Sequence, residues 1–403
     1  MRILFLTDNF PPEVNAPATR TFEHCQEWIK KGHQITVITC APNFPHGKLY
    51  NGYKNKLYQC ELISEIKVIR VWSYMSSNSG FAKRVIDYLS FAFMSFFIGI
   101  FQKHDIIIAT SPQFFTTWSG WAISKIRRKP WIFELRDLWP ESIKTVGVMK
   151  QGYIINLLEK IELGLYKSCN RVVAVTDAFK NNLIARGIEN NKIEVVTNGS
   201  NMELFYPRKV DISLLKSLGL EGKFVVGYIG THGMAHNLDF IIKAIEKISD
   251  SDVHFLFIGD GAMKSKIVNT SKELQLKNIS FLDSVSKDEV PRYLSIIDIS
   301  LAPLKKDDNF KTVIPSKIFE SSAMQIPILL GVQGQAQEIL EKYGAGVCFE
   351  PDNEKDFIEK LSALKDISFY QKCQDGCVKL AADYDRKKLA DKMLDIFDKI
   401  IKG

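Results

Sequence analysis

The sequence predicts an α/β protein with two doubly wound parallel sheets. Apolar runs of strand length alternate with helical patterns along the whole chain, and most of these runs are continuous. Continuous apolar strands separated by helices are typical of parallel sheets that are buried on both faces. The length of 403 residues is also sufficient for two domains of ordinary size. We therefore expect two such domains in succession.

The strands fall into two series on either side of a turn-rich boundary. The boundary extends from Asn198-Gly199-Ser200 to Pro207. The first series is expected at Ile3–Thr7, Gln34–Thr39, Lys67–Trp72, Asp105–Thr110, Trp131–Glu134, Arg171–Thr176 and Ile193–Thr197. The second is expected at Phe224–Ile229, His254–Ile258, Ile279–Leu282, Ile299–Pro303, Ile326–Leu330 and Gly346–Phe349. A final helix is expected from Tyr384, and its apolar pattern suits packing on either domain.

The composition is that of a globular protein that could bind anions. Hydrophobic residues make up 46% and charged residues 25% of the chain, and the net charge is +7. This mild excess suits a phosphorylated ligand or an anionic membrane, but no Lys/Arg-rich block is dense enough for nucleic acid. The seven cysteines are odd in number and scattered, without a CxxC pair, which predicts reduced thiols in a cytosolic chain and no metal site. The first ten residues are interpreted as a strand rather than a signal peptide.

One segment, Val85–Phe101, is almost wholly apolar and leaves three interpretations. Its seventeen residues are at the lower limit for a membrane span, and a spanning helix would divide the first sheet. It could equally be a buried core helix. It could also rest on a membrane surface, together with Trp118, Trp121 and the basic run from Lys125 to Lys129.

The loop after the first strand, Asp8–Arg20, contains no GxGxxG sequence, which disfavours a dinucleotide site of the usual kind. No Walker sequence occurs either. The loop places small residues and Thr19-Arg20 at the start of a helix, where an anion could approach. A plain strand–helix connection explains the same residues equally well.

Two glycine-containing loops end neighbouring strands of the second domain. Gly230-Thr231-His232-Gly233 follows one strand and Gly259-Asp260-Gly261 follows the next. Glycines there allow the backbone to approach a ligand at the carboxyl edge of the sheet, where such folds bind. His232 and His236 are four residues apart, but no third ligand is evident, so a metal is not expected.

The segment Pro315–Glu320 is the most informative in the chain. A helix that starts at Pro315 presents free N–H groups beside Lys317, and Glu320 follows one turn later. Such a helix start can hold a phosphate, and the carboxylate can bind ribose hydroxyls. Lys305, Lys306 and Lys311 precede it, which suits a diphosphate. A solvated basic loop, with Glu320 only complementing the helix dipole, is the alternative.

Polar residues also follow a strand of the first domain, in the run Glu134–Glu141. Arg136 and Asp137 could form a structural pair. They could also face the ligand cleft as substrate contacts. A tryptophan and a proline, Trp139 and Pro140, accompany them, which is uncommon for residues that serve packing alone.

Taken together, these motifs resemble the retaining glycosyltransferases of family four, which have the GT-B fold, over essentially the whole chain. The resemblance rests on the Pro-Pro-Glu loop at 11–13, the run Arg136–Ser142, the Asn198-Gly199 turn, the Gly259-Asp260-Gly261 turn and the segment 315–331. It is strongest to bacterial enzymes of O-antigen and capsule assembly that transfer N-acetylated amino-deoxysugars, such as N-acetylfucosamine. It implies two Rossmann-like domains around a cleft: residues 1–203 with a crossing-back helix at 384–403 for the acceptor, and residues 204–383 for the donor.

The chain departs from the family at three positions. The first Glu of the family's Glu-x7-Glu pattern falls on Thr312, whereas the second is Glu320. The family's two phosphate-binding basic residues align with Thr231 and His236. Lys311 and Lys317 are therefore the candidates for holding the diphosphate. The resemblance also implies metal independence and no cofactor, with helix dipoles and lysines stabilising the leaving nucleoside diphosphate.

The resemblance implies a UDP-sugar donor and a polyprenyl-diphosphate-linked saccharide acceptor. The base is expected near Gly259–Gly261 and Asp283–Val285, and the ribose at Glu320. The catalytic candidates are Arg136, Asp137 and Lys317, and the acceptor candidates are Glu13, Asn15, Arg136 and Asp137. The donor candidates are Gly230, Thr231, His232, Gly259, Asp260, Gly261, Ser284, Val285, Lys311, Thr312, Val313, Ile314, Pro315, Ser316, Lys317 and Glu320.

Two other functions fit parts of the pattern. A non-hydrolysing UDP-sugar 2-epimerase shares the two-domain fold and would use His232 and Asp260 for proton abstraction. A catalytically silent sugar-binding partner would explain the missing family residues. For the transferase, we expect a cytoplasmic protein that lies peripherally on the inner face of the cell membrane.

Overall fold

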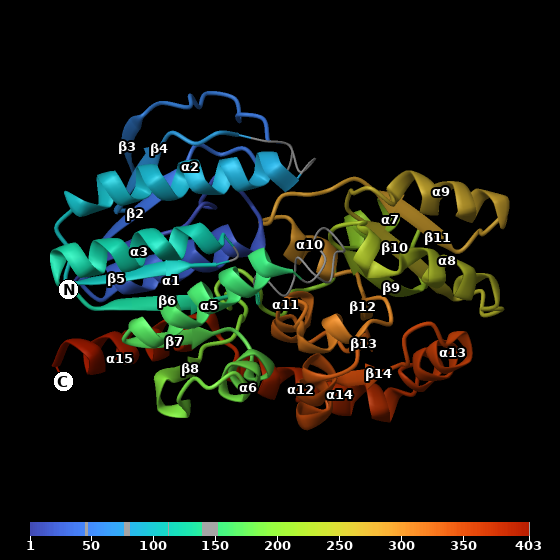
Figure 1. Cartoon of the computed structure of the whole chain (residues 1–403). Coiled ribbons are helices and arrows are strands. Elements are labelled where there is room, and N and C mark those ends of the chain that lie inside the picture. Colours follow the sequence, from blue (N-terminus) through green and yellow to red (C-terminus); the bar gives the residue numbers. More distant parts are fainter. Residues whose placement is uncertain (45–46, 76–80, 112, 139–151, 403) are drawn as a thin grey trace. The chain divides into compact units, whose positions relative to one another are not determined.

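The computed structural model describes residues 1–44, 47–75, 81–111, 113–138 and 152–402 (Figure 1). The chain divides into two compact units. Unit 1 comprises Met1–Thr197 and Lys387–Gly403, and unit 2 comprises Asn198–Arg386. Each unit contains one sheet with helices on both faces, which is the α/β doubly wound architecture expected from the sequence.

The sheet of unit 1 has the order β3-β4-β2-β1-β5-β6-β7-β8. Only the β3–β4 pair is antiparallel among these described strands. The strands are β1 (Arg2–Leu6), β2 (Gln34–Cys40), β3 (Tyr58–Ile63), β4 (Ile66–Val71), β5 (Ile106–Thr110), β6 (Trp131–Leu135), β7 (Arg171–Ala174) and β8 (Ile193–Val195). The helices are α1 (Ala16–Lys30), α2 (Phe81–Ile100), α3 (Phe114–Arg127), α5 (Tyr153–Ser168), α6 (Asp177–Ala185), η1 (Asn190–Lys192) and α15 (Arg386–Lys402).

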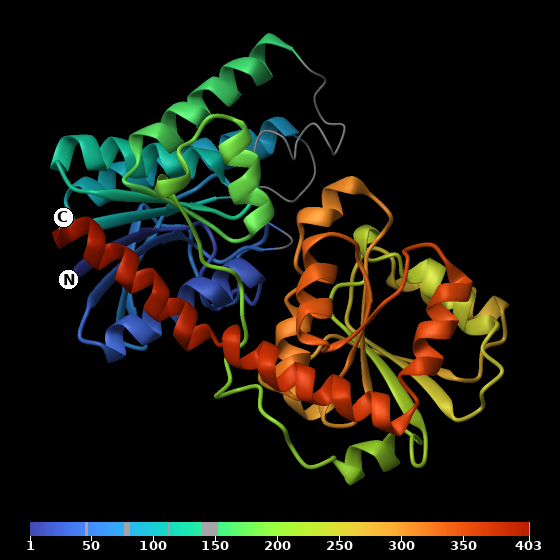
Figure 2. The same cartoon turned by 90° about the horizontal axis from the view of Figure 1, so that it is seen from below.

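Two apolar clusters cover the faces of this sheet. Helices α2, α3, α5 and α6 contribute to one cluster, and α1 and α15 contribute to the other. In the second cluster Trp28 of α1 donates its indole N–H to the carbonyl oxygen of Ala390 at 3.0 Å and packs on Phe397. Figure 2 shows α15, in red, along this face. The last helix therefore completes the core of unit 1.

The sheet of unit 2 is wholly parallel, with the order β11-β10-β9-β12-β13-β14. Its strands are β9 (Phe224–Ile229), β10 (Val253–Ile258), β11 (Ile279–Leu282), β12 (Ile299–Pro303), β13 (Ile328–Gly331) and β14 (Gly346–Cys348). Its helices are α7 (Ile212–Ser217), η2 (Met234–His236), α8 (Leu238–Glu246), α9 (Lys264–Glu273), α10 (Val290–Leu294), η3 (Asp308–Thr312), α11 (Lys317–Ala323), α12 (Gln335–Tyr343), α13 (Glu354–Ala363) and α14 (Ile367–Asp383).

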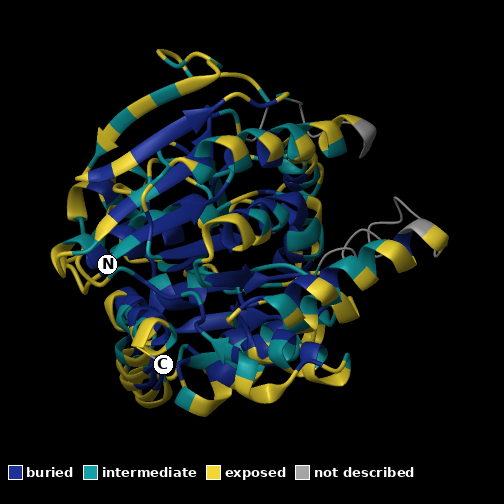
Figure 3. Cartoon of the chain, turned by 60° about the vertical axis from the view of Figure 1, so that its left-hand side comes forward, coloured by how far each residue is buried: buried dark blue, intermediate teal, exposed yellow. Residues whose placement is uncertain are grey.

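Local sequence explains where several helices begin. Asn15 precedes α1 and accepts a hydrogen bond from the backbone N–H of Ala18 at 2.9 Å. Thr176 caps α6 and Asp366 caps α14 in the same way. Short polar side chains satisfy backbone donors that a helix start leaves free. Figure 3 shows the result, with buried residues along the strands and exposed residues on the outer helix faces.

Every expected strand is present within a few residues of its expected bounds, but one strand was missed. β3 pairs antiparallel with β4 at the edge of the sheet, and its residues alternate between exposed and half-buried. Because β3 has no continuous apolar run, the pattern used to find buried parallel strands did not detect it. The helix expected from Pro315 also differs, since α11 begins at Lys317 and has seven residues.

The apolar segment Val85–Phe101 lies mostly in α2. Phe91, Ala92 and Ser95 are buried against the sheet, so one face of α2 belongs to the core. The opposite face leaves Phe93 61% and Phe101 79% exposed. Within the described residues, no helix is long and apolar enough to cross a bilayer, which removes the spanning interpretation.

Candidate active site

The loops after β9 and β10 touch through their backbones at the carboxyl edge of the unit 2 sheet. A Cβ atom on Gly259 would lie 1.9 Å from the carbonyl oxygen of Gly230, and Gly259 has φ of +147°. The backbone N–H of His232 donates to the carbonyl oxygen of Asp260 at 2.8 Å. Only glycine accepts this contact and this φ. The two predicted loops are therefore joined into one platform.

Lys317 points from the start of α11 toward this platform. Its Nζ is 3.5 Å from the ring centroid of Tyr228 and would be 2.8 Å from a Cβ atom on Gly230. Although the residue as a whole is partly exposed, Nζ is buried and has no hydrogen-bond partner among the described residues. Burial lowers the pKa of the Lys317 amine to about 7. The site therefore contains a buried basic group whose pKa the charge of Glu320 raises by less than burial lowers it.

Two histidines accompany Lys317. Both ring nitrogens of His232 and Nδ1 of His236 are buried without a partner in the described part of the chain. Both rings lie close to that of Tyr228, with centroids 5.7 and 6.1 Å away. Burial, followed by the charges of Lys264 and Lys317, lowers the pKa of His232 to about 4. Burial and the charge of Lys317 lower that of His236 to about 4.

The carboxylates near Lys317, His232 and His236 are either paired with another lysine or exposed to solvent. Glu320 forms an ion pair with Lys287, whose Nζ also lies 4.7 Å from the ring centroid of Phe205. Asp260 is exposed and accepts a hydrogen bond from the N–H of Gly261 at 2.7 Å. We call Lys317, His232 and His236 the basic cluster.

The expected lysine cluster ahead of α11 is largely neutralised. Lys311 is exposed and pairs with Asp308 at 2.7 Å, and Lys306 pairs with Glu350 at 2.8 Å. The backbone of Lys311, by contrast, packs closely on Gly334, since a Cβ atom there would lie 2.3 Å from the Lys311 oxygen. Of the predicted lysines, Lys317 is the one with a buried, unpartnered amine.

The remaining donor candidates differ in exposure. Thr231, Ser284 and Val313 are exposed, Ile314 is buried, and Gly261, Val285, Pro315 and Ser316 are intermediate. Thr312, at the position of the family's first Glu, donates its hydroxyl to the carbonyl oxygen of Asn309 at 3.0 Å. Asp283 pairs with Lys264 at 2.5 Å. Sequence reasoning missed Lys264, Lys287 and Tyr228, because only tertiary packing brings them to this edge.

Unit 1 holds a polar pocket of about 280 Å³ at the carboxyl edge of its own sheet. Carboxylates, amides and two aromatic side chains make up much of its lining, and Arg84 is the one cation among the described lining residues. They include Asp8, Glu13, Asp87, Asn9, Asn15, Asn43, Gln113 and Tyr88. Two predicted acceptor residues, Glu13 and Asn15, are among them. We call Asp8, Glu13 and Asp87 the acidic pocket residues.

Burial raises the pKa of Glu13 to about 7, although two backbone hydrogen bonds oppose the shift. Its Oε1 accepts the N–H groups of Asn43 and Phe44 at 2.8 and 2.9 Å. Burial also raises the pKa of Asp8, whose Oδ2 accepts from the amide of Gln113 at 2.6 Å. Near neutral pH the Glu13 carboxyl can therefore carry a proton, and the pKa of Asp8 is shifted in the same direction.

Arg136 and Asp137 lie next to each other beyond β6, outside the lining of this pocket. Both backbone N–H groups donate to Oγ of Ser111, at 2.8 and 3.3 Å, and Arg136 donates to the Pro17 oxygen at 3.3 Å. Both side chains are half-buried. The rest of this run, from Trp139 to Ser142, lies outside the described residues.

Arg20 is not an anion ligand, which corrects one interpretation of the first loop. Its side chain is 1% exposed and pairs with Glu134 at 3.1 Å. It also donates to the carbonyl oxygens of Thr197 and Val196. Burial opposes ionisation of Glu134, but the charges of Arg20 and Arg136 outweigh it and keep its pKa below the usual value. Arg20 therefore ties α1 to β6 and to the end of the first strand series.

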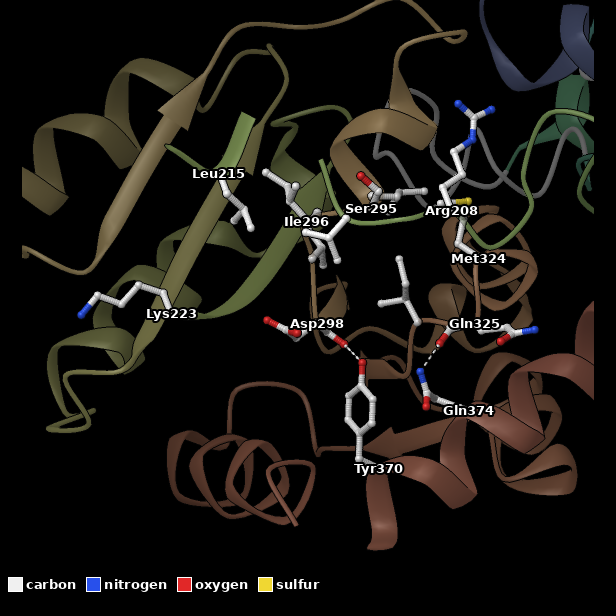
Figure 4. Close-up of a pocket in the computed structure, with 14 residues that line it drawn as sticks. Arg208, Leu215, Lys223, Ser295, Ile296, Asp298, Met324, Gln325, Tyr370 and Gln374 are labelled. Atoms are coloured by element: carbon white, nitrogen blue, oxygen red, sulfur yellow. Dashed lines mark hydrogen bonds between the residues drawn. The ribbon is translucent and has the colours of Figure 1, made fainter. Parts of the chain in front are cut away.

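A pocket of about 320 Å³ in unit 2 lies at the opposite edge of its sheet from the basic groups, beside the amino ends of β9, β12 and β13 (Figure 4). Its polar side chains mainly support the backbone. Tyr370 donates to the carbonyl oxygen of Asp298 at 2.9 Å, and Gln374 donates to that of Gln325 at 3.3 Å. In sheets of this kind ligands bind at the carboxyl edge, so we assign this pocket no site. Within the described residues, no group of His, Cys, Asp and Glu has a metal-binding arrangement.

Comparisons with known proteins agree with this architecture. Residues 18–204 match the family model described as Glycosyltransferase Family 4, and residues 213–375 match the one described as Glycosyl transferases group 1. A putative colanic acid biosynthesis glycosyl transferase, WcaI of Escherichia coli, is 24% identical over 365 residues, which is 88% of this chain and 89% of WcaI.

Two solved structures share the fold. Sucrose-phosphate synthase from Thermosynechococcus elongatus has a TM-score of 0.79 at 13% identity, covering 100% of this chain and 99% of that one. Anabaena HepE in complex with UDP-glucose has a TM-score of 0.72 at 16% identity, covering 99% and 100%. The two halves of the chain therefore match glycosyltransferase models of family 4 and group 1, and the whole chain has the two-domain GT-B fold.

Proposed function

We propose that the protein is a retaining glycosyltransferase that moves an N-acetylated, deoxy-type sugar from a UDP-sugar to a lipid-linked saccharide. The pathway would be bacterial surface polysaccharide synthesis, of the O-antigen or capsule type. The observation that carries the proposal is the basic cluster at the carboxyl edge of the unit 2 sheet. A buried, unpartnered amine beside two unpartnered imidazoles favours an anionic ligand, because such a ligand would supply the missing counter-charge.

In this proposal the donor diphosphate meets Lys317 and the backbone at Val313–Ser316, and the ribose meets Glu320. The backbone N–H groups of Ile318 and Phe319 already donate to the carbonyl oxygens of Pro315 and Ser316, so the side chain of Lys317 would be the main contact to the phosphate. Lys311 would reach the diphosphate only by giving up its pair with Asp308. The UDP-glucose bound by HepE supports uridine as the base, which we place near Gly259–Gly261 and Ser284-Val285.

The chemical step would not need a protein nucleophile. The bond between the anomeric carbon and the phosphate oxygen breaks, and a bond forms on the same face to the acceptor hydroxyl oxygen. The hydroxyl proton passes to the departing phosphate oxygen. Lys317 would stabilise the charge that develops on this oxygen without a metal ion. Arg136 and Asp137 would orient the acceptor near the reacting carbon.

The pocket of unit 1 suits a saccharide acceptor. Carboxyl and amide groups hydrogen-bond sugar hydroxyls, and the pocket provides three carboxyls and several amides in about 280 Å³. Glu13 and Asn15 would contact the acceptor sugar directly. The colanic acid function in the name of WcaI supports a polysaccharide product, for which a polyprenyl-diphosphate carrier is a suitable anchor.

We also propose that unit 1 rests on the inner face of the cell membrane through α2 and α3. Ile86, Leu89, Phe93, Phe97 and Phe101 recur at helical spacing along α2 and the residue that follows it, and all are at least 43% exposed. Trp121 and Ile126 of α3 are exposed as well, next to Lys125, Arg127 and Arg128. An apolar stripe beside basic residues suits an anionic lipid surface.

One experiment separates the candidate functions. The protein is incubated with a panel of UDP-sugars, with and without a polyprenyl-diphosphate-linked sugar, and UDP and sugar products are measured. UDP release that requires the acceptor supports transfer, and a product whose new linkage keeps the anomeric configuration supports retention. Interconversion of the donor alone would identify an epimerase. Binding without turnover of any donor would identify a silent partner.

Vesicle flotation tests the membrane contact. The double variant Phe93→Ser/Phe97→Ser should lose binding to vesicles that contain anionic lipid, whereas Ile367→Ser, which changes a residue of α14 that is 75% exposed, should bind as the wild type does. Equal flotation of all three proteins would remove α2 from the proposed surface.

A further inference from the structure

The basic cluster has no internal anion to balance it. Lys317 faces Tyr228 of β9 and the two histidines, and its own helix contributes Glu320. Glu320 is engaged by Lys287, and Tyr228 stays neutral because burial raises its pKa and its hydroxyl donates to the Thr231 oxygen at 2.6 Å. The charges of Lys264 and Asp260 also act on the pKa of His232. Lys264, however, forms an ion pair with Asp283, and Asp260 is exposed.

A positive charge in this environment is unfavourable for two reasons. First, Nζ of Lys317 is buried away from water and has no hydrogen-bond partner among the described residues. Second, any positive charge on His232 or His236 would repel a positive charge on Lys317. The ring of Tyr228 offers a cation–π contact to Nζ. Removing an ammonium from water is more unfavourable than one such contact is favourable, so the ring alone does not hold the charge.

We infer that Lys317 is a neutral amine in the empty protein at mildly alkaline pH, and that binding of a nucleoside diphosphate brings one proton onto it. This inference rests on the proposed donor site and adds its regulation by pH. The phosphate oxygens supply both the negative charge and the hydrogen-bond acceptors that Nζ lacks. His232 and His236 remain neutral at this pH whether the site is empty or occupied.

The inference has a defined thermodynamic signature. In the empty protein the Lys317 pKa of about 7 leaves the amine mostly unprotonated at pH 8. Contact with phosphate raises this pKa, so each binding event takes up about one proton. By linkage the dissociation constant then rises about tenfold for each pH unit above 7 until the bound-state pKa is reached. A related enzyme with a permanently charged residue in place of Lys317 would show no such dependence of the dissociation constant on pH.

Calorimetry with UDP measures the proton count. UDP is titrated at pH 8 in two buffers with different ionisation enthalpies, because the difference in heat gives the protons exchanged. The terminal phosphate has a second pKa of about 6, so UDP itself is almost fully ionised. We expect uptake of about one proton and an approximately tenfold weaker affinity at pH 9 than at pH 8.

Variants assign the proton to one side chain. Lys317→Met should bind UDP weakly with no uptake, and Lys317→Arg, which cannot lose its charge, should show neither uptake nor slope. His236→Gln and the surface variant Lys306→Met should each retain uptake of about one proton. Uptake that survives Lys317→Met, or disappears in His236→Gln, would overturn the assignment to Lys317.

The outcomes also separate this inference from the donor assignment. If wild-type UDP binding gives equal heats in both buffers and equal affinities at pH 8 and 9, the proton coupling is wrong and the donor site stands. If UDP fails to bind at any pH between 6 and 9 while the protein remains folded by circular dichroism, the donor assignment itself fails.

Discussion

The carboxyl edges of the two sheets both bury ionisable groups, but of opposite sign. Unit 2 buries the basic cluster Lys317, His232 and His236 without an anion. Unit 1 buries acidic pocket residues, among them Asp8 and Glu13, without a full complement of cations. In both places burial is the first cause of the pKa shifts. The difference in sign agrees with the ligands proposed above, a diphosphate for the first edge and a hydroxyl-rich saccharide for the second.

The same difference predicts opposite effects of pH on stability. Glu13 has a folded pKa of about 7 against 4.5 in the unfolded chain, so its contribution to stability falls as pH rises from 4.5 to 7. The pKa of Lys317 is about 7 in the folded protein against 10.5 in the unfolded chain. Its contribution to stability therefore rises as pH rises from 7 to 10.5. The combined destabilisation from Glu13 and Lys317 is therefore greatest near pH 7.

The largest expected effect tests the basic side of this comparison. Lys317→Met should lower kcat by about 10²–10³-fold, since a group that stabilises a developing oxyanion contributes about this much. The same variant should unfold at a higher temperature than the wild type at pH 7, because it removes a buried unpaired amine. Kinetics with the identified donor and calorimetric unfolding measure both. A variant that loses stability and activity together would indicate a structural lysine instead.

A smaller effect is expected at Glu320. Glu320→Gln should raise the donor KM about fivefold, because a hydrogen bond from ribose to a carboxylate is stronger than one to an amide by roughly 1 kcal/mol. The matched variant Lys287→Met releases Glu320 from its ion pair and should not raise the donor KM. Equal increases in both variants would mean that the ion pair, rather than the carboxylate, shapes the site.

The smallest expected effect tests the acidic side. Glu13→Gln resembles the protonated acid, so the acceptor KM at pH 6 should change less than about twofold. In the wild type the acceptor KM should rise above pH 7 as Glu13 loses its proton, and the variant should show no such rise. Measurements at saturating donor separate this effect from that of Lys317. A variant that keeps the wild-type pH profile would exclude Glu13 from acceptor binding.

The alternation of apolar runs and helices was sufficient to predict the two sheets, since buried parallel strands leave a strong signal in sequence. It did not predict β3, an edge strand in which polar and apolar residues are mixed and none is fully buried. It placed the glycine loops at 230 and 259 correctly at strand ends, because glycine is required where the two backbones meet.

The charges of the site were less predictable. The sequence pattern offered both Lys311 and Lys317 for the diphosphate, yet Lys311 is exposed and paired with Asp308, whereas the Lys317 amine is buried over Tyr228. Arg20 looked available to an anion but pairs with Glu134, 114 residues away. These outcomes depend on long-range packing, for which local spacing carries no information.

The place of α15 has a consequence for how the chain is made. Residues 386–402 supply Leu389, Met393 and Phe397 to the core that also contains Trp28 of α1. The ribosome produces the first 197 residues of unit 1 early, but the helix that covers one face of their sheet is translated only after the whole of unit 2. During the synthesis of unit 2, Trp28 and its apolar neighbours therefore stay uncovered, and such exposed apolar surface is what chaperones bind.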